Sequence, residues 1–336
     1  MKKTAIIFLL SILIFTAYLW FDHHNQPAPG WRQAPPEERL VTIKPGSSLQ
    51  DIAHLLEKEG VTRSGYIFMA YAFLQNKQGA LQAGTYRFDR EPEIDEILYK
   101  INNGIVANER VTVPEGFTVE EIAERVSENL PIESEEFLQA LENSDWELDY
   151  LPDADKVEWK LEGYLYPTTY NVNYDIEPEK LIELMLNRFE QQWLEELKNN
   201  FQADNENFSI NELVTIASMV EKEGRLKEEK PVIAGVIFNR LRAGMKLQID
   251  ASVQYALPER QERLFYRDLE IESNYNTYLH HGLPPGPIAN PGDDSLQAVL
   301  EPEDTDYLFY FALEDGSHVF TETYQEHLQK QRNLLD

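Results

Sequence analysis

The stretch Ser209–Ala251, SINELVTIASMVEKEGRLKEEKPVIAGVIFNRLRAGMKLQIDA, organises the chain. It opens with the spacing of a capping box. Ser209 can accept a hydrogen bond from the amide three residues on, and Glu212 can reach back to the Ser209 amide. Apolar residues then recur at the spacing of a helix with one buried stripe: Leu213, Ile216, Ala217 and Val220. The pattern predicts a helix that begins at Ser209.

Two carboxylates stand at the end of this helix. At about 100° per residue, Glu221 lies about 60° from the centre of the stripe, and Glu223 lies about 100° away on the other flank. Partial burial and the negative end of the helix dipole both raise the pKa of a carboxyl group at such a place, which suits a proton donor. The residues alone also fit a solvated, charged helix end.

A second helix is expected from Pro231, which is placed to start it. Its apolar face comprises Val232, Ile233, Val236, Ile237 and Leu241. Asn239 and Arg240 lie beside that face and offer amide and guanidinium donors. After Gly244, the order Leu247, Gln248, Asp250 alternates like a short extended segment.

Five motifs resemble the endolytic murein transglycosylase family, also called YceG-like. In chain order they are LEGYLYPTTY (Leu161–Tyr170), ASMVEKEG (Ala217–Gly224), IAGVIFNRL (Ile233–Leu241), MKLQIDASVQYAL (Met245–Leu257) and YNTYLHHGLPPGPIANPG (Tyr275–Gly292). The resemblance implies a lytic transglycosylase that acts on peptidoglycan strands, with Glu221 as the catalytic residue. It also implies that the substrate-binding residues are Glu162, Asn239, Gln248, Asp250, Asn276 and Tyr278.

The reaction that the family implies can use a single carboxyl group. The acid protonates the departing oxygen of a MurNAc–GlcNAc β-1,4 bond, and its conjugate base then deprotonates the muramyl C6 hydroxyl, which closes on C1 to give a 1,6-anhydro end. Glu223 is the rival acid, and Asp250 or Glu162 is the rival second carboxylate. The family pattern commonly has Thr after the second Glu, whereas this chain has Gly224.

Two other functions stay open on the sequence. A hydrolase with two carboxylates could cut the same glycan. A non-catalytic glycan-binding scaffold could recruit cell-wall synthases, which are also candidate partners of the enzyme. Neither the reaction nor the motifs call for a cofactor or a metal, and no HExxH or Cys/His spacing accompanies His280 and His281.

Composition excludes several classes of function. The chain of 336 residues has a net charge of −29 and no Cys. Disulfides, thiolate metal sites and Cys nucleophiles are therefore excluded. The negative charge argues against nucleic acid as a partner, because neutralising phosphates needs a basic face. A neutral or zwitterionic substrate fits better than a polyanion.

The N-terminus predicts a membrane anchor. Lys2 and Lys3 precede an apolar run over residues 4–20, which reaches about 25 Å as a helix and can span a thinned bilayer. The flanking charges place the N-terminus in the cytoplasm. We therefore expect a single-pass protein of the inner membrane with its C-terminal domains in the periplasm. No convincing signal-peptidase site follows the run, so the anchor is expected to remain uncleaved.

An internal repeat lies between the anchor and the central stretch. VTIKPGSSLQDIAHLL (Val41–Leu56) matches VTVPEGFTVEEIAERV (Val111–Val126) without a gap. Each copy predicts a short strand, a Gly turn and a capped helix. The first copy resembles a LysM-type module, a small fold often used to bind N-acetylhexosamine chains, although such a unit could also only support the next domain.

These features together predict an α+β protein. We expect a transmembrane helix over 1–20, a linker over 21–40, a LysM-like βα module over 41–108 and a larger mixed α+β catalytic domain over 109–336. Within that domain, residues 127–160 show no site. A proline-rich loop before Gly292 is expected to aim Asn276 and Asn290 at the cleft, and Asp315-Gly316 predicts a terminal hairpin.

Overall fold

The computed structural model describes residues 38–89, 92–144, 146, 148–200, 208–259, 261 and 263–334. The predicted anchor over residues 4–20 lies outside these ranges. Among the described residues, no helix has the length and apolarity needed to cross a membrane. The chain divides into two compact units: one ends at Glu109 and also includes Asn171–Asp175, and the other comprises Arg110–Tyr170 and the chain from Ile176 onward.

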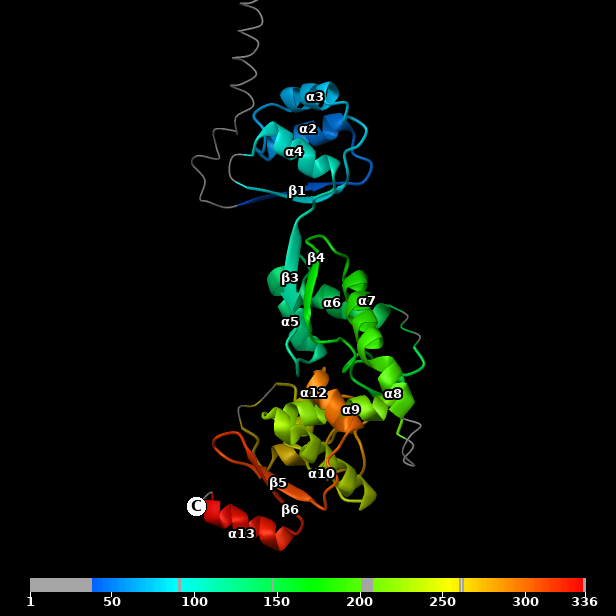
Figure 1. Cartoon of the computed structure of the whole chain (residues 1–336), viewed down its shortest axis with the longest axis vertical. Coiled ribbons are helices and arrows are strands. Elements are labelled where there is room, and N and C mark those ends of the chain that lie inside the picture. Colours follow the sequence, from blue (N-terminus) through cyan, green and yellow to red (C-terminus); the bar gives the residue numbers. More distant parts are fainter. Residues whose placement is uncertain are drawn as a thin grey trace, which may run out of the picture. The chain divides into compact units, whose positions relative to one another are not determined.

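The first unit is a two-stranded sheet covered by three helices (Figure 1). Strand β1 (Arg39–Ile43) pairs antiparallel with β2 (Gly84–Phe88), from Arg39 opposite Phe88 to Ile43 opposite Gly84. The helices are α2 (Leu49–Lys58), α3 (Gly65–Leu74) and α4 (Ile94–Asn102). Helices α2 and α4 contact the sheet, and α3 packs on both of them. The core between these layers is fully buried and includes Leu56, Phe68, Tyr86, Phe88 and Ile101.

The second unit begins with a copy of the same local design. Strands β3 (Asn108–Thr112) and β4 (Thr169–Asn173) form a two-stranded sheet, of which Arg110–Thr112 and Thr169–Tyr170 belong to this unit. Helix α5 (Val119–Asn129) follows β3 and α6 (Ser134–Asn143) packs on it. A long helical segment then runs through α7 (Pro178–Phe189), a π-helical turn (Glu190–Leu194) and α8 (Glu195–Asn200). The π turn interrupts what would otherwise be one continuous amphipathic helix.

The central stretch forms the helical core of this unit. Helices α9 (Ile210–Glu223), α10 (Lys230–Arg242) and α12 (Asp293–Leu300) pack against one another (Figure 1). Helix α11 (Asp250–Ala256) contacts α9. The chain ends with the hairpin β5 (Phe309–Ala312) and β6 (His318–Thr321) and with α13 (Tyr324–Leu334). Short 3-10 turns cover Ala154–Lys156, Lys227–Glu229 and Asp268–Glu270.

The local predictions for the central stretch are confirmed, with one correction. The Ser209–Glu212 capping box is formed, and α9 begins one residue later. The expected single buried stripe is wrong, because every residue from Leu213 to Val220 is buried. Helices pack around α9 on several sides, so it is a central helix and not a surface one.

The internal repeat is confirmed as a repeat of structure. Ser48 caps α2 and Thr118 caps α5, each in a capping box. The preceding glycines, Gly46 and Gly116, both adopt left-handed backbone conformations, with φ of 80° and 74°. Glycine accepts this conformation without steric cost, which explains why both copies keep it at the turn. The mixed α+β class is likewise as predicted.

Candidate active site

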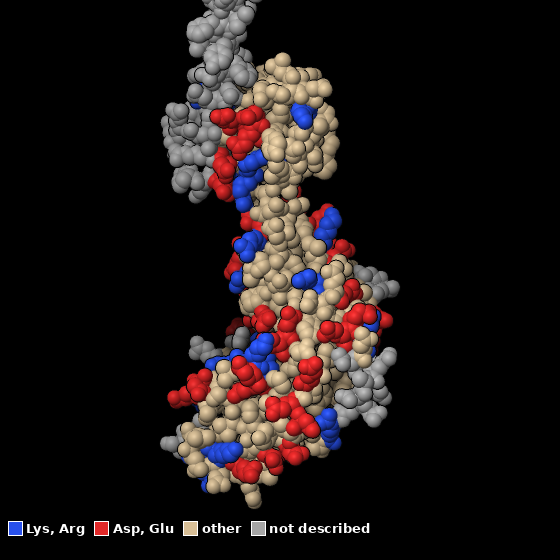
Figure 2. Space-filling model, in the orientation of Figure 1, with Lys and Arg blue, Asp and Glu red and all other residues tan. Residues whose placement is uncertain are grey.

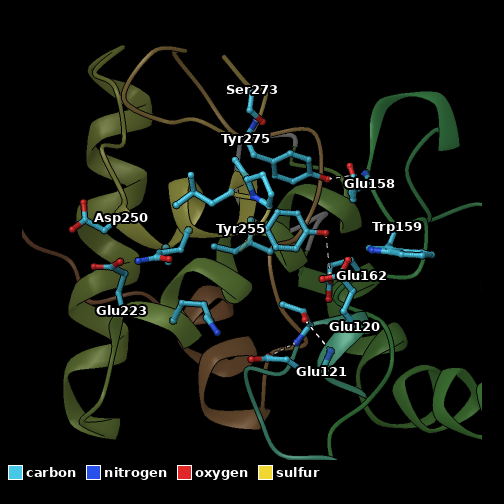
Figure 3. A pocket seen from close by; sticks show the side chains of 18 residues that line it. Glu120, Glu121, Glu158, Trp159, Glu162, Glu223, Asp250, Tyr255, Ser273 and Tyr275 are labelled. Carbon is cyan, nitrogen blue, oxygen red and sulfur yellow. Dashed lines mark hydrogen bonds between the residues drawn. The ribbon is translucent and has the colours of Figure 1, made fainter. Parts of the chain in front are cut away.

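A cavity of about 530 Å³ opens in the second unit (Figure 3). Its walls come from segments that are distant in the sequence: Thr118–Glu121, Glu158–Glu162, the end of α9, α11 with the residues after it, and Ser273–Tyr275. Acidic side chains dominate the lining, namely Glu120, Glu121, Glu158, Glu162, Glu223 and Asp250. Figure 3 shows Glu223 and Asp250 together on one side of the cavity, and Glu162, Glu120 and Trp159 on the other.

Glu223, the last residue of α9, has the environment of a proton donor. Burial raises the pKa of its carboxyl group, and the nearby negative charge of Asp250 raises it further. The Tyr310 hydroxyl donates to Glu223 Oε2 at 3.0 Å. This bond lowers the pKa of Glu223 by less than burial raises it. Glu223 therefore combines access to the cavity with a raised pKa.

Glu221 has a different environment, although it is only two residues away. Its Oε2 accepts from Lys230 Nζ at 3.1 Å, from the Gly292 amide at 3.0 Å and from Ser295 Oγ at 2.6 Å. The side chains of Glu221 and Lys230 are 10% and 7% exposed. Glu221 does not line the cavity. Three donors on one oxygen, one of them a cation, match an ionised carboxylate that joins α9, α10 and α12.

Gly224 explains how α10 can approach so closely. A Cβ atom at this position would lie 2.9 Å from Lys230 Cγ and 3.1 Å from the Val220 carbonyl oxygen. The missing side chain therefore makes room for the stem of Lys230 next to Glu221. The hydroxyl that contacts Glu223 in this chain comes from Tyr310 of β5, not from the position after Glu223.

Glu162 is a fully buried carboxyl group at the opposite wall. It accepts from the Val119 amide at the start of α5, from Asn290 Nδ2 at 3.0 Å and from the Tyr255 hydroxyl at 3.2 Å. Burial raises its pKa to about 8, against the opposing effect of these donors. Its contacts join α5, the proline-rich loop and α11, so Glu162 connects the elements of the wall.

Asp250 is exposed to the cavity at the first turn of α11. The Tyr278 hydroxyl donates to Asp250 Oδ1 at 2.5 Å and fixes the carboxylate beside Glu223. Burial and this bond raise the pKa of Tyr278, so it remains a donor. Asp250 thus lies in the cavity as expected, and Tyr278 acts through it without lining the cavity.

The remaining predicted binding residues do not line the cavity. Asn239 Nδ2 donates to the carbonyl oxygens of Thr305 and Tyr307, which attaches α10 to the segment before β5. Asn276 is buried and uses its amide to close its own loop on Leu269 and Ile271. Gln248 is exposed, with a left-handed φ of 51°. The substrate contacts expected of these three residues stay predictions.

Several lining residues were not identified from the sequence. Residues 127–160 were expected to hold no site, yet Glu158 and Trp159 line the cavity. Tyr255 and Tyr275 form a tilted pair with ring centroids 4.8 Å apart, and the Glu158 amide donates to the Tyr275 hydroxyl (Figure 3). Tyr255 and Tyr275 belong to quoted motifs, so the motifs contained this signal. Nothing local marks Trp159.

The extended segment predicted for Leu247–Asp250 is confirmed only in part. Leu247 and Ile249 are buried while Gln248 and Asp250 are exposed, which is the expected alternation. The segment pairs with no strand, because Asp250 already begins α11.

No group of three or more His, Cys, Asp or Glu among the described residues is arranged to hold a metal ion.

Comparison with known proteins identifies the family of this chain. The model of the YceG-like family matches residues 41–333. A crystal structure of a yceG-like protein from Listeria monocytogenes superposes with a TM-score of 0.62 at 33% identity, covering 88% of this chain and all of that one. The chain belongs to the YceG-like family.

Curated relatives carry a more specific name. An endolytic murein transglycosylase of Bacillus subtilis (strain 168) is 35% identical over 303 residues, which cover 85% of this chain and 82% of the relative. An endolytic murein transglycosylase of Streptococcus pneumoniae serotype 2 is 32% identical over 317 residues. The match covers 85% of this chain but 56% of that longer protein.

Proposed function

We propose that this chain is an endolytic lytic transglycosylase of peptidoglycan and that Glu223 is its catalytic acid and base. The observation that carries the proposal is the contrast between two neighbouring carboxyl groups. Glu223 lines the cavity and has a raised pKa, whereas Glu221 is held in an internal ion pair. The names of the relatives supply the substrate and the type of reaction.

In the first step, the protonated Glu223 donates its proton to the glycosidic oxygen between MurNAc and GlcNAc. The bond from C1 of MurNAc to that oxygen breaks, and positive charge develops at C1 and the ring oxygen. Asp250 stands beside Glu223 and supplies negative charge on the same side of the cavity (Figure 3). A fixed carboxylate at this place stabilises the developing cation more than the neutral ground state.

In the second step, the Glu223 carboxylate takes the proton from the C6 hydroxyl of the same MurNAc residue. The C6 oxygen then bonds to C1 and closes the 1,6-anhydro ring. The carboxyl group is restored, no water is consumed, and the atoms balance within the glycan. The Tyr310 hydroxyl donates to Oε2 and favours the charged form, so it assists the release of the proton in the first step and holds the carboxylate in place for the second.

The rest of the cavity suits an amino sugar chain. Sugar rings have apolar faces that pack on aromatic side chains, and Trp159, Tyr255 and Tyr275 provide such faces. The acidic lining disfavours polyanions and tolerates neutral sugars with amide substituents. Glu162 maintains the wall that carries Tyr255.

We further propose that residues 4–20 anchor the chain in the cytoplasmic membrane, with both units on its outer side. The apolar run behind Lys2 and Lys3 supports this topology. An anchored enzyme of this kind would act on glycan strands close to the membrane where they are made.

The test is digestion of purified glycan strands by the full chain, wild type and Glu223→Gln, followed by mass analysis of the new ends. Anhydro ends that disappear in the variant support the proposal. Ends that are one water heavier identify a hydrolase. No release by the wild-type chain, with glycan still bound, identifies a non-catalytic scaffold.

A further inference from the structure

Helix α3 of the first unit has an apolar outer face. Tyr66, Phe73 and Leu74 are 78%, 61% and 80% exposed. Their spacing, with the exposed Ala70 between them, places them along one side of the helix. The opposite side, with Ile67, Phe68 and Ala72, is buried in the core of the unit. The helix is therefore apolar on both sides, although only one side is needed for folding.

The charge pattern around α3 differs from that of the rest of the chain. No residue between Glu59 and Asp89 is acidic, whereas the average composition of the chain would place about five acidic residues in a stretch of that length. On the face drawn in Figure 2, the end of this unit that carries α3 is mostly tan, while the acidic side chains gather elsewhere on the unit. An apolar patch without negative charge is uncommon on a protein with a net charge of −29.

We propose that this outer face of α3 docks on the surface of the lipid bilayer. The inference rests on the proposed anchor. Residues 21–37 connect the anchor to the first unit and reach at most about 60 Å when extended, with a typical span of about 25 Å for a flexible chain. Tethering at this distance keeps the unit at a high local concentration next to the membrane, so a weakly binding face is sufficient.

The side chains match the interface region of a bilayer and not its hydrocarbon core. Tyr66 can place its ring at the boundary between headgroups and acyl chains and its hydroxyl among the headgroups. Phe73 and Leu74 add apolar area at the same depth. Two of the three basic residues in the stretch, Arg63 and Lys77, flank the helix. Because the attraction comes from the apolar side chains, it is expected to persist on zwitterionic lipid and at high salt.

The absence of Cys in the chain permits a direct test. The full chain carrying Ala70→Cys is labelled with an environment-sensitive fluorophore and reconstituted in phosphatidylcholine vesicles that contain a lipid quencher near the headgroups. Lys44→Cys, in the exposed turn after β1, is the matched control. The Ala70 label is expected to be quenched at least twofold more than the Lys44 label, with no loss in 0.5 M salt.

Two substitution pairs then assign the effect to the apolar side chains. Phe73→Ser with Leu74→Ser is expected to remove the excess quenching, whereas Gln75→Ser with Gln78→Ser, at exposed positions beyond the same helix end, should leave it unchanged. Equal quenching of the two labels in floating vesicles would overturn the docking and leave the anchor intact. Energy transfer between two labelled copies without quenching by lipid would overturn it in favour of self-association.

Flotation of the vesicles reports on the anchor separately. A chain that does not float overturns the anchor and this inference with it, while the activity of the chain on glycan strands is measured independently. Failure of docking is therefore distinguishable from failure of the proposed reaction.

Discussion

Glu221 and Glu223 provide a matched pair of substitutions that tests the assignment of the catalytic acid. In Glu223→Gln, the amide cannot donate the proton that the leaving oxygen needs. General acid–base catalysis contributes about 10²–10⁴-fold, and the proposed mechanism assigns both proton transfers to this one group, so we expect a loss of about 10³-fold or more. The fold should tolerate the change, because the Tyr310 hydroxyl can still donate to the amide oxygen.

Glu221→Gln should have the opposite profile. It leaves Lys230 buried without its carboxylate, and removing one partner of a buried ion pair costs about 3 kcal/mol or more. In a unit of this size, that loss lowers Tm by about 6–12 °C. The rate for each folded molecule should stay within about tenfold of the wild type, since Glu221 does not line the cavity.

The assay compares the two variants at a temperature where both are folded. Release of anhydro ends from glycan strands is followed by mass spectrometry, and Tm is measured by calorimetry on the same samples. If Glu221→Gln abolishes release without lowering Tm while Glu223→Gln still releases anhydro ends, the reasoning is refuted and Glu221 is the acid.

Three further predictions concern single groups. Tyr310→Phe removes a bond that lowers the pKa of Glu223, so the alkaline limb of the kcat/KM profile should move to higher pH; an unmoved limb would contradict the contact. Glu162 has a folded pKa of about 8, above its ordinary value of 4.5, so the folded state binds more protons between these values and stability should fall as pH rises through this window. Denaturant unfolding should show that Glu162→Gln, which resembles the protonated form, reduces this dependence, and an unchanged dependence would assign it to other groups. Gly163→Ala adds a Cβ atom 2.6 Å from Pro287 at a φ of 91°, so we expect a loss of about 2 kcal/mol or more in unfolding free energy, and a loss below 0.5 kcal/mol would show that the loop yields.

Features that depend on neighbouring residues could be predicted from the sequence. The capping box at Ser209, the repeated strand, Gly turn and helix, and the terminal hairpin at Asp315-Gly316 all formed where expected. In each, the side chain and the backbone group it satisfies lie within a few residues. The family resemblance was equally recoverable, because its motifs are contiguous.

The roles of individual polar residues could not be predicted in this way. Helical periodicity placed Glu221 and Glu223 on the two flanks of α9, but their environments are set by Lys230, Ser295 and Tyr310, which approach from other elements. Sequence position cannot show which flank faces a partner helix and which faces a cavity.

The side-chain amides of the quoted motifs show the same limit. Asn239 and Asn276 have the chemistry of sugar ligands, yet the structure uses them to satisfy backbone carbonyl groups in irregular segments. Asn290 likewise bonds Glu162 and the Leu165 amide. Distinguishing a ligand from an internal partner requires knowing which carbonyl groups lack a helix or strand to bond to.

The contact between Tyr310 and Glu223 also bears on when activity can begin during biosynthesis. Tyr310 belongs to β5 and follows Glu223 by 87 residues, so the ribosome adds it well after α9 has been made. A nascent or prematurely terminated product that ends before β5 lacks the hydroxyl that positions Glu223. The proposed catalytic group therefore gains this contact only once β5 has been made, and deletions that remove β5 should impair turnover even though they spare the cavity walls.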